Sequence, residues 1–343
     1  MNMKRKSILV VGGGGIGERH VRCFLATGRA EVSVCDANPE RLAKLKESYP
    51  VKATFSDFNE VDPTGFDGIL IATPANMHIP MALRCAEHRI PFLIEKPLSV
   101  NMEGVDRLIE LARGIPCGVA YVRRSTHSFK RLKELAGSGI TGRLRMGRFN
   151  FSQDYRKYRP DYQRIYYARA DMGGGCILDA ASHSINLAQW FFGEVDDTVA
   201  FYDRLEFEGV EVEDSSIILL RFREGGALVE LFTNQFQQPN IVEIELIGNK
   251  GNLRYTVDGE MHKISFCNSD ANKWEEMGRY RITRDDPFIA QAHDFLDAIE
   301  GGGALPTSIE EARETLAVAL AAKAFQHDHP PRSSLWKKIG VAM

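Results

Sequence analysis

The chain has 343 residues, with 43 Lys or Arg against 46 Asp or Glu and a formal net charge of −3 at pH 7. This near balance offers no long-range attraction to nucleic acid or anionic lipid, and no apolar run approaches the roughly 20 residues that cross a bilayer. Six scattered cysteines without a close pair indicate reduced thiols rather than a disulfide framework. We therefore expect a cytoplasmic protein of about two domains that acts on a small molecule.

The first 122 residues alternate short apolar runs with stretches of helical spacing. The runs are nearly continuous, which is typical of parallel strands buried on both faces. They are SILVVG, EVSVCD, DGILIAT, PFLIEK and GIPCGVAYVRR, and the helical stretches are 17–27, 39–48, 79–88 and NMEGVDRLIELAR. This βαβ series predicts an α/β domain with a doubly wound parallel sheet over residues 1–122.

Residues 123–343 have a different pattern. GRLRMGRFNFSQ has the composition of a strand, and two further strand pairs flank the turns at 224–226 and 249–251. Helices are expected over 179–192, 286–300 and 308–327. We predict an α+β domain built on a large, mostly antiparallel open sheet, which serves substrate binding and oligomerisation and whose closing helices can pack back on the first domain.

A glycine-rich motif follows the first strand. VVGGGGIGERH satisfies G-x-G-x-x-G where a helix opens, which permits a tight turn, approach of a pyrophosphate and close helix–strand packing. This context predicts a Rossmann-type dinucleotide site rather than a ligand-free turn. Asp36 ends the second strand, where its carboxylate can accept from ribose hydroxyls and oppose a 2′-phosphate. NAD is therefore favoured over NADP, although Arg41 lies close enough to keep NADP open. The expected cofactor loop comprises Gly12, Gly14, Gly15, Ile16 and Gly17.

Two further strand ends carry polar residues. In ATPANMH, Thr73 and Pro74 form a turn, and Asn76 and His78 can project above the sheet where a nicotinamide ribose would lie. The alternative is a helix N-cap with a surface histidine.

The next strand ends in IEKPLSV, at the edge where open α/β sheets bind ligands. Lys96 can contact both cofactor and substrate there, and its ammonium can stabilise charge developing on a substrate oxygen. Glu95 can hydrogen-bond to the ribose or the cofactor amide, and Pro97 fixes the turn. The alternative is a solvated charge pair.

GGGCILDAASH supplies a second polar group. Asp179 and His183 are four residues apart and share a face of a helix, so a neutral imidazole there can take a proton from a substrate hydroxyl. Asp179 can orient that imidazole or hold the substrate. The glycines at 173–175 let the backbone pass close to the cofactor. The alternative is a surface pair.

In this order the motifs resemble the Gfo/Idh/MocA oxidoreductases, which include inositol and sugar dehydrogenases. The resemblance runs over nearly the whole chain, from GGGGIG through EKP to LPTSIEEARETLAVALAA. It implies a catalytic group of Lys96, Asp179 and His183, and sheet-to-sheet dimers or tetramers. Members often carry H-E-x-D after the histidine, whereas this chain has Ser184 and Asn186, a departure that bears on the substrate inferred from inositol-type members and leaves the hydride chemistry intact.

Further substrate contacts are expected beyond the parallel strands. Arg123 and Arg124 face the domain junction, with surface cations as the alternative. The segment SQDYRKYRPDYQRIYYARADMGG, which contains Asp154 and Tyr155, has aromatics that can stack on a sugar and arginines that can pair with a carboxylate or phosphate; it can equally serve as an intersubunit arm. No metal is expected, because HDH at 327–329 lacks further ligands.

Together these features predict an NAD-dependent dehydrogenase of a polyol, sugar or sugar derivative. His183 is the expected acid/base and Lys96 stabilises the alkoxide. Leu219, Val229 and Leu231 are expected on an open sheet face that pairs in a homodimer or homotetramer. The alternatives are an NAD-dependent lyase or glycosidase-type enzyme that uses transient oxidation, and a non-catalytic NAD(P)-binding regulator.

Overall fold

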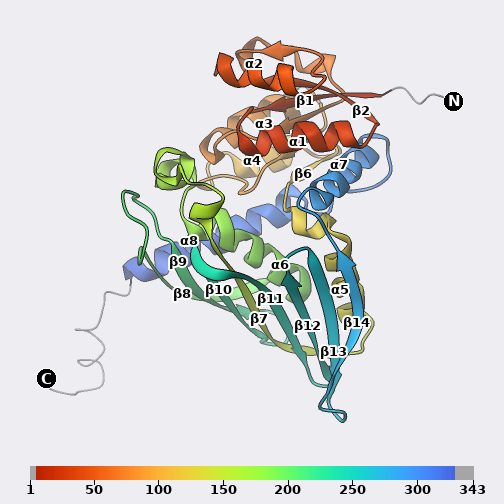
Figure 1. Ribbon diagram of the computed structural model, residues 1–343, viewed down its shortest axis with the longest axis vertical. Coiled ribbons are helices and arrows are strands. Elements are labelled where there is room, and N and C mark those ends of the chain that lie inside the picture. The colour runs from red at the N-terminus through yellow and green to blue at the C-terminus, as the bar shows by residue number, and fades with distance from the viewer. Residues whose placement is uncertain (1–4, 329–343) are drawn as a thin grey trace, which may run out of the picture.

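A six-stranded parallel sheet forms the first part of the computed structural model, which describes residues 5–328 (Figure 1). Its strand order is β3-β2-β1-β4-β5-β6, so the doubly wound sheet is confirmed. The predicted runs are buried strands, and the two-residue β3 was not expected. The strands are β1 (Lys6–Val11), β2 (Ala30–Cys35), β3 (Thr54–Phe55), β4 (Gly68–Ile71), β5 (Phe92–Ile94) and β6 (Cys117–Val119).

The strand order reverses between β1 and β4, and the carboxyl ends of these neighbours open a crevice at such a switch point. The motifs after β1, β2, β4 and β5 therefore meet at one edge of the sheet. The connecting helices are α1 (Gly15–Ala26), α2 (Pro39–Ser48), α3 (His78–Glu87) and α4 (Val105–Leu111).

The second part is an eight-stranded sheet of order β14-β13-β12-β11-β7-β10-β9-β8, in which only β7 and β10 pair in parallel. Both predicted hairpins form. β8, β13 and β14 were not predicted. A strand with one solvent-exposed face carries polar residues at alternate positions and therefore lacks a continuous apolar run. The strands are β7 (Leu144–Asp154), β8 (Val195–Asp203), β9 (Ser215–Phe222), β10 (Leu228–Asn234), β11 (Phe236–Gly248), β12 (Gly251–Asp258), β13 (Met261–Asn268) and β14 (Trp274–Arg281).

Helices cover one face of this sheet. α6 (Ser182–Phe192) contacts β7 and β10, α8 (Ile309–Asp328) contacts β8, and α5 (His127–Gly137), which was not predicted, contacts β12 and β13. Phe149 and Ile244 are fully buried on this inner face.

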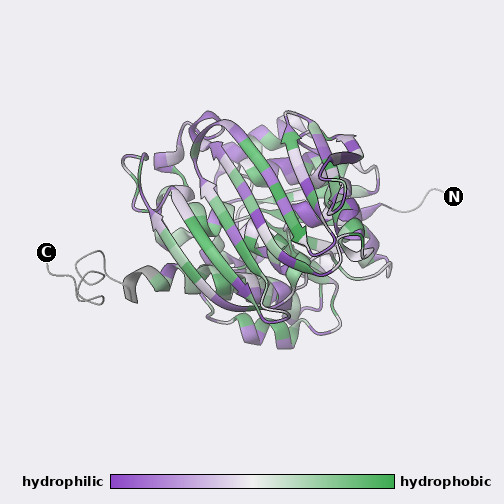
Figure 2. Cartoon of the chain, turned by 90° about the horizontal axis from the view of Figure 1, so that it is seen from below, coloured by the Kyte–Doolittle hydropathy of each residue, from purple (hydrophilic) through white to green (hydrophobic). Residues whose placement is uncertain are grey.

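The strands of this sheet contain both hydrophobic and hydrophilic residues (Figure 2), and large apolar side chains are also exposed on the opposite face. Leu219 is 51% exposed there, as expected, but Val229 and Leu231 are buried on the inner face. A one-residue shift along a strand moves a side chain to the other face, so the pattern alone assigned these two wrongly. The exposed large apolar residues that β7, β8, β9 and β10 place on the open face are Met146, Phe201, Ile217, Leu219 and Leu228.

The last helices return to the first part. α7 (Asp286–Ile299) packs on α1, with the ring of Phe295 edge-on to Phe24 at 6.2 Å. Arg22 of α1 donates two hydrogen bonds of 2.6 Å to Asp285. α7 thus completes one core of the α/β part.

No helix within residues 5–328 has the length and apolar character needed to cross a membrane. All six cysteines fall in that range and none forms a disulfide.

Candidate active site

The glycine loop has the geometry that a dinucleotide requires. Gly12 adopts φ +101°, a left-handed conformation that favours glycine, and a Cβ on Gly17 would lie 1.8 Å from the Gly12 carbonyl oxygen. Gly14 is the N-cap of α1, has no neighbour within 4 Å of a Cβ position, and no side chain caps the helix. The first N–H groups of α1 are therefore available to a pyrophosphate.

Asp36 stands at the end of β2 as predicted. Its Oδ2 accepts from Gly13 N at 2.6 Å and its Oδ1 from Asn38 N at 2.7 Å, while Arg41 Nη1 lies 3.5 Å from Oδ2. A carboxylate has about four acceptor sites, so these bonds leave capacity for ribose hydroxyls. The residues present therefore fit an NAD adenosine as well as its pyrophosphate.

His78 does not project above the sheet, and that prediction is wrong. Its side chain is buried, with Nδ1 2.9 Å from the Pro97 carbonyl oxygen and Nε2 2.9 Å from the Thr73 carbonyl oxygen. It thus ties the loop after β4 to the loop after β5. Asn76 is exposed and Pro74 is half-buried on the same turn.

Glu95 is also turned inward, so it is not part of a solvated charge pair. It is 5% exposed, and its Oε1 lies 2.6 Å from Nε2 of His20 on α1. Its Oε2 accepts from the backbone N–H of Lys96 at 3.0 Å. Glu95 therefore anchors the backbone that carries Lys96 to α1.

Lys96 joins the two parts of the protein. Its ammonium donates to the carbonyl oxygen of Asp179 at 2.6 Å and to Oδ1 at 2.8 Å, and the Lys96–Pro97 peptide is cis. Tyr166 donates to the same Oδ1 at 2.8 Å. Lys96 and Asp179 come together as expected. Tyr166 was missed, because it is one of several aromatics in a segment without periodicity.

His183 lies near this group but does not pair with Asp179, contrary to the expectation that Asp179 orients it. Its Nδ1 is buried without a hydrogen-bond partner in the described residues, and its ring stands edge-on to Tyr121 at 5.6 Å. The charged ammonium of Lys96 is a stronger partner for the carboxylate than a neutral imidazole. Burial, then the cations Lys96 and Arg123, hold the pKa of His183 well below its ordinary value, so the imidazole is neutral at pH 7.

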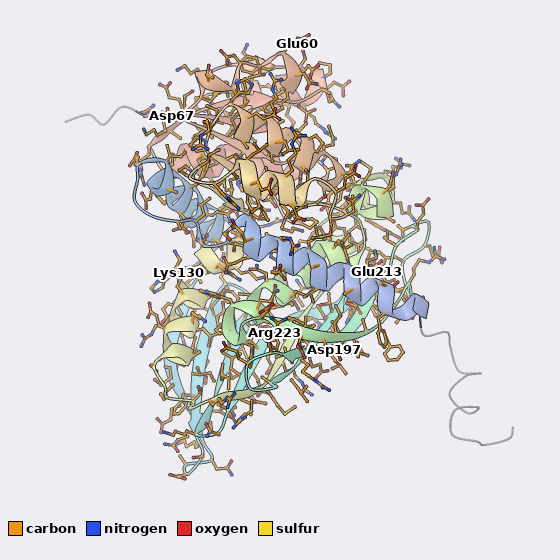
Figure 3. All side chains as sticks on the ribbon, turned by 180° about the vertical axis from the view of Figure 1, so that it is seen from behind. Glu60, Asp67, Lys130, Asp197, Glu213 and Arg223 are labelled. Atoms are coloured by element: carbon orange, nitrogen blue, oxygen red, sulfur yellow. The ribbon has the colours of Figure 1, made fainter. Side chains whose placement is uncertain are left out.

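Glu213 fixes the start of this segment. Its carboxylate accepts from the N–H of Ile177, at the start of the π-helix Ile177–Ala181, and lies 3.3 Å from Lys323 of α8 (Figure 3). Gly175 has φ +91°, and a Cβ there would lie 2.6 Å from the Glu213 oxygens. Glu213 was not predicted as part of the site, because it lies 36 residues from Ile177 in the sequence and no motif links the two.

The two consecutive arginines, Arg123 and Arg124, have different surroundings. Arg124 is 2% exposed and donates to Glu311 at 2.6 Å and to the Asn186 carbonyl oxygen at 2.9 Å, so neither substrate binding nor a surface position describes it. The Arg123 guanidinium lies 4.0 Å from the centre of the Phe151 ring and forms no ion pair within the described residues. Burial lowers its pKa to about 10.

Asp154 and Tyr155 are both buried, and Tyr155 lies beside Tyr166 and Asp179. Asp154 is 3% exposed and accepts from Arg156 at 3.0 Å and from Gln238 at 2.6 Å. Tyr155 is buried and stacks on Tyr167 at 4.4 Å. Burying a carboxylate requires nearby partners, and Asp154 finds them within the protein.

No metal-ligating group of three or more His, Cys, Asp or Glu occurs in the part of the chain that the structure describes. His329 lies outside the described residues.

Comparisons with known proteins agree with this geometry. Residues 6–121 match the model of an oxidoreductase family with an NAD-binding Rossmann fold, and residues 129–254 match the GFO/IDH/MocA C-terminal domain. A myo-inositol 2-dehydrogenase of Thermotoga maritima is 25% identical over 328 residues, covering 92% of this chain and 94% of that protein. A levoglucosan dehydrogenase of Pseudarthrobacter phenanthrenivorans is 22% identical, covering 90% and 93%.

A solved levoglucosan dehydrogenase, in complex with NADH and levoglucosan, has the same fold. Its TM-score is 0.83 at 21% identity, over 95% of this chain and 98% of that one. The two matched models together span both parts of the molecule, including the glycine loop, Lys96 and Asp179. The chain therefore belongs to the Gfo/Idh/MocA family and is an NAD-binding oxidoreductase.

Proposed function

We propose that this protein oxidises a secondary alcohol of a polyol, sugar or sugar derivative with NAD. The observation that carries the proposal is the convergence of Lys96, Asp179 and His183 at the carboxyl edge of the parallel sheet, beside a glycine loop that fits a dinucleotide. The inositol and levoglucosan dehydrogenases among its relatives support the substrate class.

The protein's own groups account for the proton and the charge. Bound NAD supplies a hydride acceptor for the substrate C–H bond. The neutral imidazole of His183 accepts the hydroxyl proton, while the ammonium of Lys96 donates to the oxygen as negative charge develops on it. Asp179, which also accepts a hydrogen bond from Tyr166, holds the ammonium in position. Arg123, half-buried and without an ion pair in the described residues, can donate to another substrate oxygen.

A substrate screen tests this proposal. Formation of NADH is followed by absorbance with inositols, aldoses, amino sugars and nucleotide sugars, and the ketone is quantified. Net NADH in proportion to ketone is expected with at least one class. Conversion of a glycoside without net NADH would instead assign a lyase or glycosidase that oxidises transiently, and binding of NAD without turnover of any compound would favour a regulator.

NADH is expected to bind more tightly than NADPH, because the Asp36 carboxylate repels a 2′-phosphate. Asp36→Ser should reduce the NADH preference by roughly 10-fold, as one lost charge contact predicts. Fluorescence titration of both nucleotides measures this. Arg41→Ala is the control for the neighbouring cation, and wild-type protein that prefers NADPH would contradict the assignment.

We also propose a homodimer or homotetramer that forms through the open face of the second sheet. Five large apolar side chains lie on that face, where Met146, Leu219 and Leu228 help line a hollow of about 510 Å³. A second copy of the same face would remove them from water.

Leu219→Glu is accordingly expected to shift the protein toward monomers in analytical ultracentrifugation. Leu205→Glu is the matched control, because Leu205 is 65% exposed but lies in the segment after β8 rather than within a strand. A monomeric wild-type mass at micromolar concentration would rule out this assembly.

A further inference from the structure

An arginine of the second part reaches the glycine loop of the first. Arg159 lies between β7 and the π-helix, and its Nη2 is 3.4 Å and its Cζ 3.8 Å from the position that a Cβ on Gly15 would occupy. Gly15 is the first residue of α1. Because this residue has no side chain, the guanidinium can lie directly beside the open N-terminus of the helix.

Arg159 has no anionic partner among residues 5–328. Its one side-chain hydrogen bond runs from Nη1 to the carbonyl oxygen of Tyr158 at 3.0 Å, which leaves Nη2 free. Its backbone is held by bonds from its N–H to the Tyr155 carbonyl oxygen at 2.9 Å and from the N–H of Tyr162 to its own carbonyl oxygen at 3.1 Å. The position of the guanidinium therefore follows from the local turn and not from an ion pair.

The surroundings of Arg159 have an excess of positive charge. Burial lowers the pKa of Arg19, and the positive charges of Arg284, Arg22 and Arg159, which all lie near it, lower that pKa further. The carboxylate of Asp285 opposes this shift, and it pairs with Arg22 at 2.6 Å and with Arg19 at 3.6 Å. Asp285 thus pairs with two of these guanidinium groups, whereas Arg159 and Arg284 form no ion pair within residues 5–328, which leaves an excess of positive charge near Arg19.

We infer that Arg159 is a cofactor-binding residue that donates to the diphosphate of the dinucleotide from the substrate part of the protein. The inference extends the NAD binding that the family assigns to residues 6–121, and no part of it depends on the identity of the substrate. The diphosphate carries the negative charge that the cluster lacks, and a guanidinium beside helix N–H groups is suited to phosphate oxygens. The segment that carries Arg159 also carries Tyr166, which donates to Asp179.

Binding titrations test this role without turnover. Arg159→Ala is expected to weaken binding of NADH, measured by fluorescence, and of ADP, measured by calorimetry, by about 10-fold or more, since hydrogen bonds to charged groups are among the stronger ones. Binding of adenosine, which has no phosphate, should stay within twofold of wild type. Arg159→Lys should retain part of the affinity because it keeps the charge.

Arg164→Ala is the matched control, because Arg164 lies in the same segment but is exposed, and it should bind all three compounds as wild type does. The melting temperature of each variant shows whether it is folded. NADH and ADP affinities of Arg159→Ala within twofold of wild type, or tighter, would overturn the inference. A wild-type protein that binds NADH but oxidises none of the screened compounds would defeat the proposed function and leave this test intact.

Discussion

Lys96→Ala is expected to lower kcat by about 10²- to 10³-fold while the NADH dissociation constant changes little. Removing one donor to a developing oxyanion typically has an effect of this size, and the charge on the substrate oxygen is larger in the transition state than in the ground state. Asp179 would also lose its cationic partner and is buried, so some loss of stability accompanies the change.

The measurement is steady-state kcat with NADH affinity and Tm recorded for the same preparation. Lys130→Ala is the matched control, because Lys130 of α5 forms a lysine–aspartate pair of 3.2 Å with Asp294 of α7. If Lys96→Ala kept near-normal kcat with an intact fold, the EKP motif would be a strand-end turn and nothing more.

His183→Ala is expected to lower kcat by on the order of 10²- to 10⁴-fold, the usual contribution of a positioned base. The pH profile adds a sharper expectation. Burial, Lys96 and Arg123 depress the pKa of His183, so the imidazole is still neutral at pH 6.5 and becomes protonated only at lower pH. The acid limb of kcat/KM should therefore lie below pH 6.5.

Lys96→Met removes one of the cations that disfavour the imidazolium, so the pKa of His183 should rise and activity should be lost at a higher pH than in wild type. The kcat/KM profile of Lys96→Met from pH 4.5 to 8 checks the sign. An acid limb that stays in place or moves to lower pH would show that His183 is not the titrating base.

The fold was largely predictable because buried parallel strands leave an unmistakable apolar run, and because glycines at 12 and 17 are required by backbone geometry. The missed strands β8, β13 and β14 have one polar face, so half of their positions resemble a loop. Val229 and Leu231 were also assigned to the wrong face of the sheet. Alternation shows that successive side chains point to opposite faces, but it does not show which face each one takes.

The site was predictable in part for a related reason. A residue's place at a strand end can be inferred from its neighbours in sequence, and this located Lys96 and Asp36. Whether a polar side chain turns inward depends on partners far along the chain. The inward orientation of Glu95 and Arg124 was missed because their partners, His20 and Glu311, lie 75 and 187 residues away in the sequence.

The central claim is that Lys96 and His183 act on the same substrate oxygen. The most direct test is kcat of the double variant Lys96→Ala, His183→Ala, on the substrate that the screen identifies, compared with the two single variants. Groups that act as a unit lose less together than the product of their separate losses, so the double variant should be only slightly slower than the slower single variant. A kcat reduced by the full product of the two single effects would show that the residues act independently and would contradict the mechanism.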